Sequence, residues 1–302
     1  MPAIRYVPRH AIDDVKWNAC IDNASNGLIY AYTFYLDNMC PNWGGLVLDD
    51  YAAVMPLPWR KKWGIAYLYQ PFAIAQSGLF GNNLSADLLY EVLKNIPATF
   101  RYWDMNLNFG NLFDVPPFVV QKRNNFILPL NKPYETVQQQ YRQHIKRNIK
   151  KAVAKNCVVQ KNIEVDHVIA LAKKHEASWG TEQDFEHFKK LYLWLFEKGQ
   201  AVTYAVVETS GAILASAVFF YSNNRAYYIL PGNAFTGRSA GASHFLIDHF
   251  IKDHAGQNRI LDFEGSDVPN LQFFYTSFGA VNEPYAAIRH NRLPWYLKWL
   301  KR

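Results

Sequence analysis

The sequence predicts an α/β protein with mixed sheets, built from two similar halves, and three observations support this. The chain has 302 residues, half of them hydrophobic, and a chain of this length usually forms more than one domain. Its apolar residues alternate in some segments and recur at helical spacing in others. The second half follows the order β-α-α-β-β-β-α-β-α-β, which the first half repeats in blurred form without a residue-level repeat.

Periodicity places the elements of the first half. We expect strands at 3–7, 46–48, 51–56, 64–69 and 101–106, and helices at 11–24, 33–39 and 85–95. A hairpin about Asn124-Asn125 is predicted to pair 118–121 with 126–130. Pro133 then interrupts the chain, and 134–156 is predicted as one basic helix. The domain boundary is therefore predicted after residue 132, giving domains 1–132 and 133–302.

The second half is predicted in the same way. Strands are expected at 158–161, 202–208, 213–221, 225–230, 259–264 and 285–290. Helices are expected at 165–178, 182–198, 241–254 and 270–278.

Charge and composition narrow the possible functions. A formal net charge of +7 and a pI of about 9.1 favour an anionic ligand such as a nucleotide-bearing cofactor, RNA or a lipid headgroup, although unremarkable proteins share this balance. Cys20, Cys40 and Cys157 match no metal or redox spacing, and the histidines lack the i, i+4 pair of a helical metal site, so no metal is expected. The N-terminus has no apolar signal region, which predicts a cytoplasmic location.

A Gly-rich segment, 232–243, joins a predicted strand to a predicted helix. This position leaves backbone N–H groups and the positive helix end available to a phosphate. Small residues would let a ligand approach the main chain, and Arg238 adds a charged donor. An ordinary turn would have the same composition. The phosphate-binding hypothesis assigns the site to Gly232, Arg238, Ser239, Ala240, Gly241, Ala242 and Ser243.

Two acids and a tyrosine are candidates for catalysis. Alternation along 260–265 places Asp262 and Glu264 on one strand face. In a cleft their pKa values would rise and suit them to accept a proton from an amine, whereas at an exposed strand end they would pair with Arg or Lys. Tyr275 lies on a predicted helix rich in Phe, where it is either a core aromatic or an acid for a leaving group.

These segments resemble the GNAT N-acetyltransferases. Residues 238–243 resemble the Gln/Arg-x-x-Gly-x-Gly/Ala segment that holds the coenzyme A pyrophosphate in that family, with Ser243 in place of the last small residue. Tyr275 and Gly279 match the family's Tyr-x-x-x-Gly segment, which implies that Tyr275 protonates the departing thiolate. The family's Asn seven residues earlier is replaced by Val268.

The wider pattern resembles the FemAB-like branch of that superfamily, whose members carry two tandem GNAT-type domains. It rests on 261–266, 273–279 and 294–296, on the basic helix 142–155 and on 55–59. The resemblance implies a degenerate N-terminal domain and a C-terminal domain that holds the cofactor. It also implies transfer of an acyl group, most simply acetyl, from acyl-CoA to a small-molecule or peptide amine, with Glu264 or a water it orders as base and the backbone near Leu230 polarising the carbonyl.

Two other functions stay open at this stage. FemA, FemB and FemX proteins transfer an amino acid from aminoacyl-tRNA to a cell-wall precursor, and the basic helix is either a tRNA contact or a solvated face. Those enzymes tend to have Lys where Tyr275 stands, which favours a thioester donor here. A non-catalytic ligand-binding or scaffold protein on the same fold is the second alternative. Finally, the aromatic and basic segment 293–302 either contacts a membrane surface or caps the core.

Overall fold

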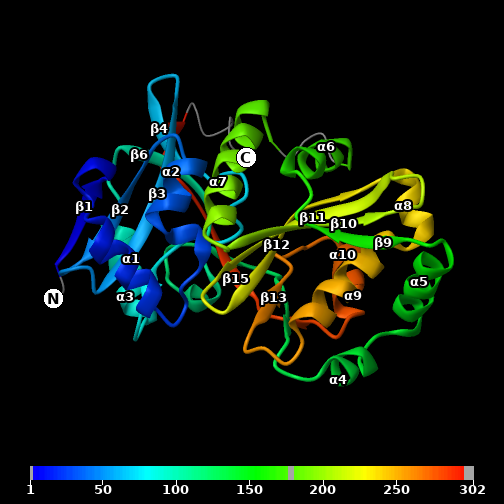
Figure 1. The fold of residues 1–302 in the computed structure, drawn as a ribbon. Coiled ribbons are helices and arrows are strands. Elements are labelled where there is room, and N and C mark those ends of the chain that lie inside the picture. Colours follow the sequence, from blue (N-terminus) through cyan, green and yellow to red (C-terminus); the bar gives the residue numbers. More distant parts are fainter. Residues whose placement is uncertain (1–2, 176–179, 296–302) are drawn as a thin grey trace. The chain divides into compact units, whose positions relative to one another are not determined.

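The computed structural model describes residues 3–175 and 180–295 and forms two compact units. The first comprises 1–123 with 284–302, and the second comprises 124–283. The chain therefore leaves the first unit after Arg123 and returns to it after Glu283, whereas the sequence suggested one boundary after residue 132. In each unit a mixed sheet is covered by helices (Figure 1).

The first unit contains an eight-stranded sheet among its described residues, in the order β1-β2-β3-β4-β6-β15-β7 with β5 beside β3. The strands are β1 (Ile4–Pro8), β2 (Trp43–Leu48), β3 (Ala53–Lys62), β4 (Ile65–Leu68), β5 (Phe80–Gly81), β6 (Phe100–Asn106), β7 (Val120–Arg123) and β15 (Tyr285–Asn291). The α-helices are α1 (Asp14–Asn23), α2 (Thr33–Met39) and α3 (Ala86–Lys94), and 3-10 turns lie at Arg9–Ala11, Ile29–Ala31 and Phe109–Asn111.

The second unit contains a seven-stranded sheet within the described part of the chain, in the order β14-β8-β13-β12-β11-β10-β9. Its strands are β8 (Phe126–Pro129), β9 (Val158–Lys161), β10 (Ala201–Val207), β11 (Ile213–Ser222), β12 (Arg225–Asn233), β13 (Ile260–Asp262) and β14 (Val281–Asn282). Its helices are α4 (Tyr134–Gln139), α5 (Gln143–Ala154), α6 (Val165–His175), α7 (Glu182–Glu197), α8 (Phe235–Ala240), α9 (Ala242–His254) and α10 (Pro269–Thr276).

The two sheets share one plan, which confirms the predicted tandem duplication. Four successive antiparallel strands are followed by one parallel neighbour, β6 beside β4 in the first unit and β13 beside β12 in the second. The next strand in each sheet comes from the other half of the chain: β15 lies beside β6, and β8 lies beside β13. The halves therefore exchange one strand each.

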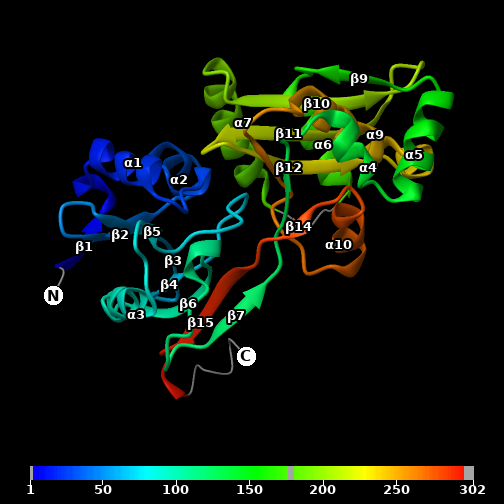
Figure 2. The same ribbon diagram turned by 90° about the horizontal axis from the view of Figure 1, so that it is seen from below.

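This exchange shows that the predicted hairpin about Asn124-Asn125 is wrong. Strand β7 pairs with β15 in the first sheet (Figure 2), whereas β8 pairs with β13 and β14 in the second. The two segments are consecutive in the chain but belong to different sheets.

The predicted helix 134–156 is also interrupted. Arg142, between α4 and α5, has an extended backbone, and its N–H donates to the carbonyl oxygen of Ser277 at 2.9 Å. A tertiary hydrogen bond thus replaces a helical one. Helix α6 is described as far as His175, so the rest of the predicted helix 165–178 lies outside the described residues, as does the predicted terminal segment from residue 296 onward. None of the described helices is long and apolar enough to cross a bilayer.

A buried ion network fixes one end of the β12–β13 pair. Arg225, only 6% exposed, donates to Asp262 at 2.8 Å and to both carboxylate oxygens of Glu283 at 2.8 Å. Parallel pairing starts at Arg225 and ends where Tyr227 pairs with Asp262. Strand β12 then continues to Asn233 while β13 stops, so the two strands separate.

In the first unit, the corresponding end of β6 is bonded to the chain's own backbone. The side-chain amide of Asn106 donates to the carbonyl of Ala75 at 2.9 Å, and that of Asn108 donates to Ser77 at 2.9 Å. Asn111 likewise donates to Leu79 at 2.9 Å. The segment after β4 therefore fills this part of the first unit.

Replacing Arg225 by Met should destabilise the second unit by about 3–5 kcal/mol, because Asp262 would remain as a buried charge without its partner. The matched control is Arg289→Met, which removes an ion pair to Asp104 whose side chains are 55% and 48% exposed. That change should cost about 0–1 kcal/mol. Equal losses for the two variants in denaturant unfolding would contradict the role given to the Arg225 network.

Candidate functional site

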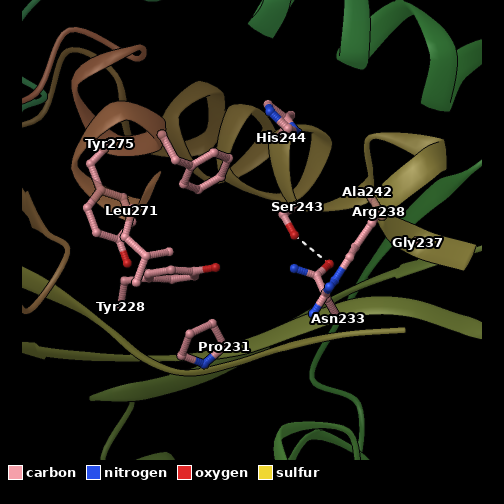
Figure 3. Close-up of a pocket in the computed structure, with 11 residues that line it drawn as sticks. Tyr228, Pro231, Asn233, Gly237, Arg238, Ala242, Ser243, His244, Leu271 and Tyr275 are labelled. Atoms are coloured by element: carbon pink, nitrogen blue, oxygen red, sulfur yellow. Dashed lines mark hydrogen bonds between the residues drawn. The ribbon is translucent and has the colours of Figure 1, made fainter. Parts of the chain in front are cut away.

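A pocket of about 270 Å³ lies in the second unit, where β12 leaves β13 (Figure 3). Four elements form it: the end of β12, α8, the beginning of α9, and α10. It is lined by Tyr228, Pro231, Asn233, Gly237, Arg238, Ala242, Ser243, His244, Leu271, Phe274 and Tyr275.

An irregularity in β12 shapes one wall. The pairing with β11 shifts register between Val218–Ile229 and Ser216–Gly232, and Leu230 has a left-handed backbone with φ of 53°. This is a β-bulge, which turns neighbouring residues out of the regular ladder. Pro231 at the bulge lines the pocket and has no N–H to offer a ligand.

The predicted Gly-rich loop is a short helix, α8, followed by a left-handed residue, Gly241, and then α9. Gly241 has φ of 76°, and a Cβ there would collide with the carbonyl group of Asn148 on α5. A Cβ on Gly237 would collide with the carbonyl of Leu214, and one on Gly232 would lie 2.9 Å from the backbone N of Ala172. These glycines permit close packing of the protein's own backbone.

Part of the predicted phosphate segment does reach the pocket. Arg238, Ala242 and Ser243 line it, whereas Leu230, Gly232, Ser239, Ala240 and Gly241 are not among the lining residues. Arg238 is exposed and has no ion-pair partner in the described chain. No side chain caps the start of α9, so its first backbone N–H groups and positive dipole end lie uncapped beside Ala242 and Ser243. The arrangement suits an anion.

Ser243 and Asn233 form a polar pair across the pocket. The Ser243 hydroxyl donates to the Asn233 side-chain oxygen at 2.5 Å (Figure 3). Beside them, burial lowers the pKa of His244 to about 4, and the Asn148 amide lies 3.2 Å from His244 Nε2. His244 is therefore neutral near pH 7.

Two tyrosines provide the other polar groups. Tyr275 is 5% exposed and stacks on Phe263 with ring centroids 4.5 Å apart, and Tyr228 is 6% exposed. Burial raises the pKa of both phenols, and the nearby Glu264 carboxylate raises that of Tyr275 further. Both hydroxyls stay protonated, and neither makes a hydrogen bond to a described residue. The Tyr228 hydroxyl points into the pocket (Figure 3).

Sequence reasoning missed Tyr228. It lies in a strand rich in aromatic residues, where periodicity marks it as core. Its place beside a pocket follows from the end of the β12–β13 pairing at Tyr227, which periodicity does not show.

The two acids do not share a strand face. Strand β13 ends at Asp262, and Glu264 has a left-handed backbone with φ of 60°, so the alternation assumed for 259–264 stops. Asp262 is 1% exposed and bonded to Arg225, so it pairs with an arginine, but in a buried position and not at the exposed strand end of the sequence-based alternative. Neither acid is among the residues that line the pocket.

A basic surface adjoins the pocket. Helix α5 packs against α9, and the exposed cations on it and at its N-cap are Arg142, Arg147, Lys150 and Lys151. The Arg142 guanidinium lies 4.9 Å from the ring centroid of Phe273 on α10. Among the described residues, no group of three or more His, Cys, Asp or Glu side chains could hold a metal ion.

Comparison with known proteins supports the fold. No protein-family model and no curated sequence matches the chain. Among solved structures, FemX matches with a TM-score of 0.64 at 12% identity, over 96% of this chain and 98% of that chain. L-PGS from Bacillus licheniformis matches with a TM-score of 0.57 at 11% identity, over 95% of each chain. A conserved protein of unknown function from Bacteroides thetaiotaomicron has a TM-score of 0.57 at 12% identity, over 96% of this chain and 100% of that chain.

The chain therefore has the tandem GNAT-like fold of the FemAB-like proteins, as the sequence predicted. At this level of identity the likeness concerns the fold, and the function has to be argued from the site.

Gly241→Ala should destabilise the second unit more than Gly256→Ala. Both positions have positive φ, 76° and 82°, but only Gly241 faces another backbone, and a Cβ at Gly256 would meet nothing within 4 Å. The Gly256 variant should cost about 1–2 kcal/mol for the left-handed backbone, and the Gly241 variant roughly 1–3 kcal/mol more for overpacking. Equal decreases in Tm for the two variants would show that α5 can move away from Gly241 without loss of stability.

Proposed function

We propose that this protein is an acyltransferase whose donor binds the second-unit pocket, and that the donor is an acyl-CoA and the acceptor a small-molecule or peptide amine. One observation carries the proposal: the pocket opens where β12 separates from β13, beside an uncapped helix start and the unpaired Arg238. The helix start and Arg238 suit the carrier's phosphates.

The free edge of β12 supports the placement of the carrier's arm. Beyond Tyr227, β12 has no partner on its β13 side among the described residues. An extended arm with amide groups, such as pantetheine, can add to such an edge through backbone hydrogen bonds. The thioester would then lie near Tyr228 and Tyr275.

Transfer requires three proton or hydrogen-bond roles. The amine nitrogen attacks the thioester carbonyl, so a C–N bond forms and the C–S bond breaks. Tyr275 gives its proton to the departing sulfur, and a water ordered by Glu264 takes the proton from the amine. The Tyr228 hydroxyl donates to the carbonyl oxygen in the transition state. Pro231 at the bulge cannot do this, because proline has no backbone N–H. Asp262 stays paired with Arg225 and positions the strand.

A second candidate function is transfer from aminoacyl-tRNA. The exposed cations of α5, close to both α9 and α10, favour a long polyanionic carrier. The likeness to FemX supports the same candidate at the level of the fold. Its salt dependence would be steep, because each phosphate contact releases counterions.

Thermal shifts with four ligands should separate the candidates. We expect acetyl-CoA, a longer acyl-CoA or free CoA to raise the Tm, because a ligand that binds only the native state stabilises it. Stabilisation by aminoacyl-tRNA alone would favour the second candidate. A bound ligand without turnover of any donor would favour a non-catalytic binding or scaffold protein.

Two conservative variants test the chemistry. Tyr275→Phe should lower kcat at least about tenfold with little change in donor affinity, because the phenol acts only at the transition state. Tyr228→Phe should lower kcat by about 10²-fold, the loss typical of removing one oxyanion donor. A donor whose thiol has a low pKa releases its sulfur without a proton from Tyr275. With such a donor and an amine acceptor, turnover should be restored in the Tyr275 variant and not in the Tyr228 variant. Unchanged kcat would remove the corresponding tyrosine from the mechanism.

A further inference from the structure

A second feature lies in the first unit, at the hairpin of β3 and β4. Lys62 pairs with Ile65, so the turn consists of Trp63 and Gly64, with φ of 50° and 80°. Two successive residues with positive φ define a type I′ turn. The hairpin projects beyond the other strands of its sheet (Figure 1).

Trp63 is an unfavourable residue for folding at this position. The first residue of a type I′ turn is preferably Asn, Asp or Gly, because a bulky side chain is strained in the left-handed conformation. Trp63 is 73% exposed, and the Lys62 ammonium lies 4.8 Å from its ring centroid. Trp63 therefore destabilises the turn conformation and buries little apolar area in return.

Cations precede this exposed ring along the hairpin. Arg60, Lys61 and Lys62 precede it and are all exposed. Along the hairpin, an open depression of about 440 Å³, called the hairpin cavity below, is lined by Lys61 and Arg101, together with Trp59 and neighbouring residues. Neither Lys61 nor Arg101 has an ion-pair partner among the residues the structure describes. An anion entering this cavity would meet two cations.

We propose that this hairpin docks on an anionic lipid surface, with Trp63 in the headgroup layer and a lipid phosphate in the hairpin cavity between Lys61 and Arg101. An indole with one wet and one apolar side prefers the membrane interface. Basic residues beside it gain from the negative surface potential. A single aromatic at a projecting tip suits insertion, whereas single-stranded nucleic acid is held by several stacking rings along a groove. The proposal is independent of the function assigned to the second unit.

The first test is Trp63→Asn in the full-length protein. Asn is a preferred residue in this turn, so the Tm should stay the same or rise. Co-sedimentation with vesicles of phosphatidylcholine and phosphatidylglycerol should detect binding by the wild type and a loss in the variant. The control is Val15→Asn, which removes another exposed apolar residue of the same unit, 79% exposed, and should bind like the wild type.

The second test removes charge. Lys61→Gln with Lys62→Gln should weaken vesicle partitioning roughly thirtyfold, whereas Lys132→Gln with Lys190→Gln, an equal charge change elsewhere, should have little effect. Wild-type binding should disappear with vesicles of phosphatidylcholine alone. Equal loss in both double variants, unchanged binding by Trp63→Asn, or binding to a single-stranded RNA in place of the vesicles would each overturn the proposal.

Discussion

The second unit depends on a buried charge that must be neutralised. Arg225 is held by Asp262 and Glu283, and this network clamps the parallel strands β12 and β13 at one end. Because a buried guanidinium that loses a partner is strongly destabilised, the network holds the two strands together at this end. The strands separate beyond Tyr227, and the pocket opens there.

Local elements were largely predictable from the sequence. Periodicity placed a helix at 33–39 and a strand at 158–161, where the structure has α2 and β9. The hairpin at 118–130 failed because the true partner of β7 is β15, more than a hundred residues away, and alternation does not reveal partners. The helix at 134–156 failed for a related reason, since the bond from Arg142 to Ser277 depends on tertiary packing.

The site was predicted in part. A motif resemblance led to 238–243, of which Arg238, Ala242 and Ser243 line the pocket. Spacing could not show that Gly241 is required by α5, because any close backbone approach, to a ligand or to the protein, selects glycine. Alternation wrongly extended β13 to Glu264, because the left-handed backbone of Glu264 ends the alternation of side chains between the two strand faces. Tyr228 could not be identified from the sequence, because the pocket beside it opens only where β12 loses β13 after Tyr227, and periodicity does not show where a pairing ends.

The exchange of strands between the halves affects how the protein is made. Strand β15 completes the first sheet, although it lies almost three hundred residues after β1 in order of synthesis. Until Asn291 has left the ribosome, β6 and β7 carry edges that nothing in the first half can cover, and such edges invite pairing with other chains. If the gene were divided at its midpoint, the first fragment would carry β8 of the second sheet, and the second fragment would carry β15 of the first sheet.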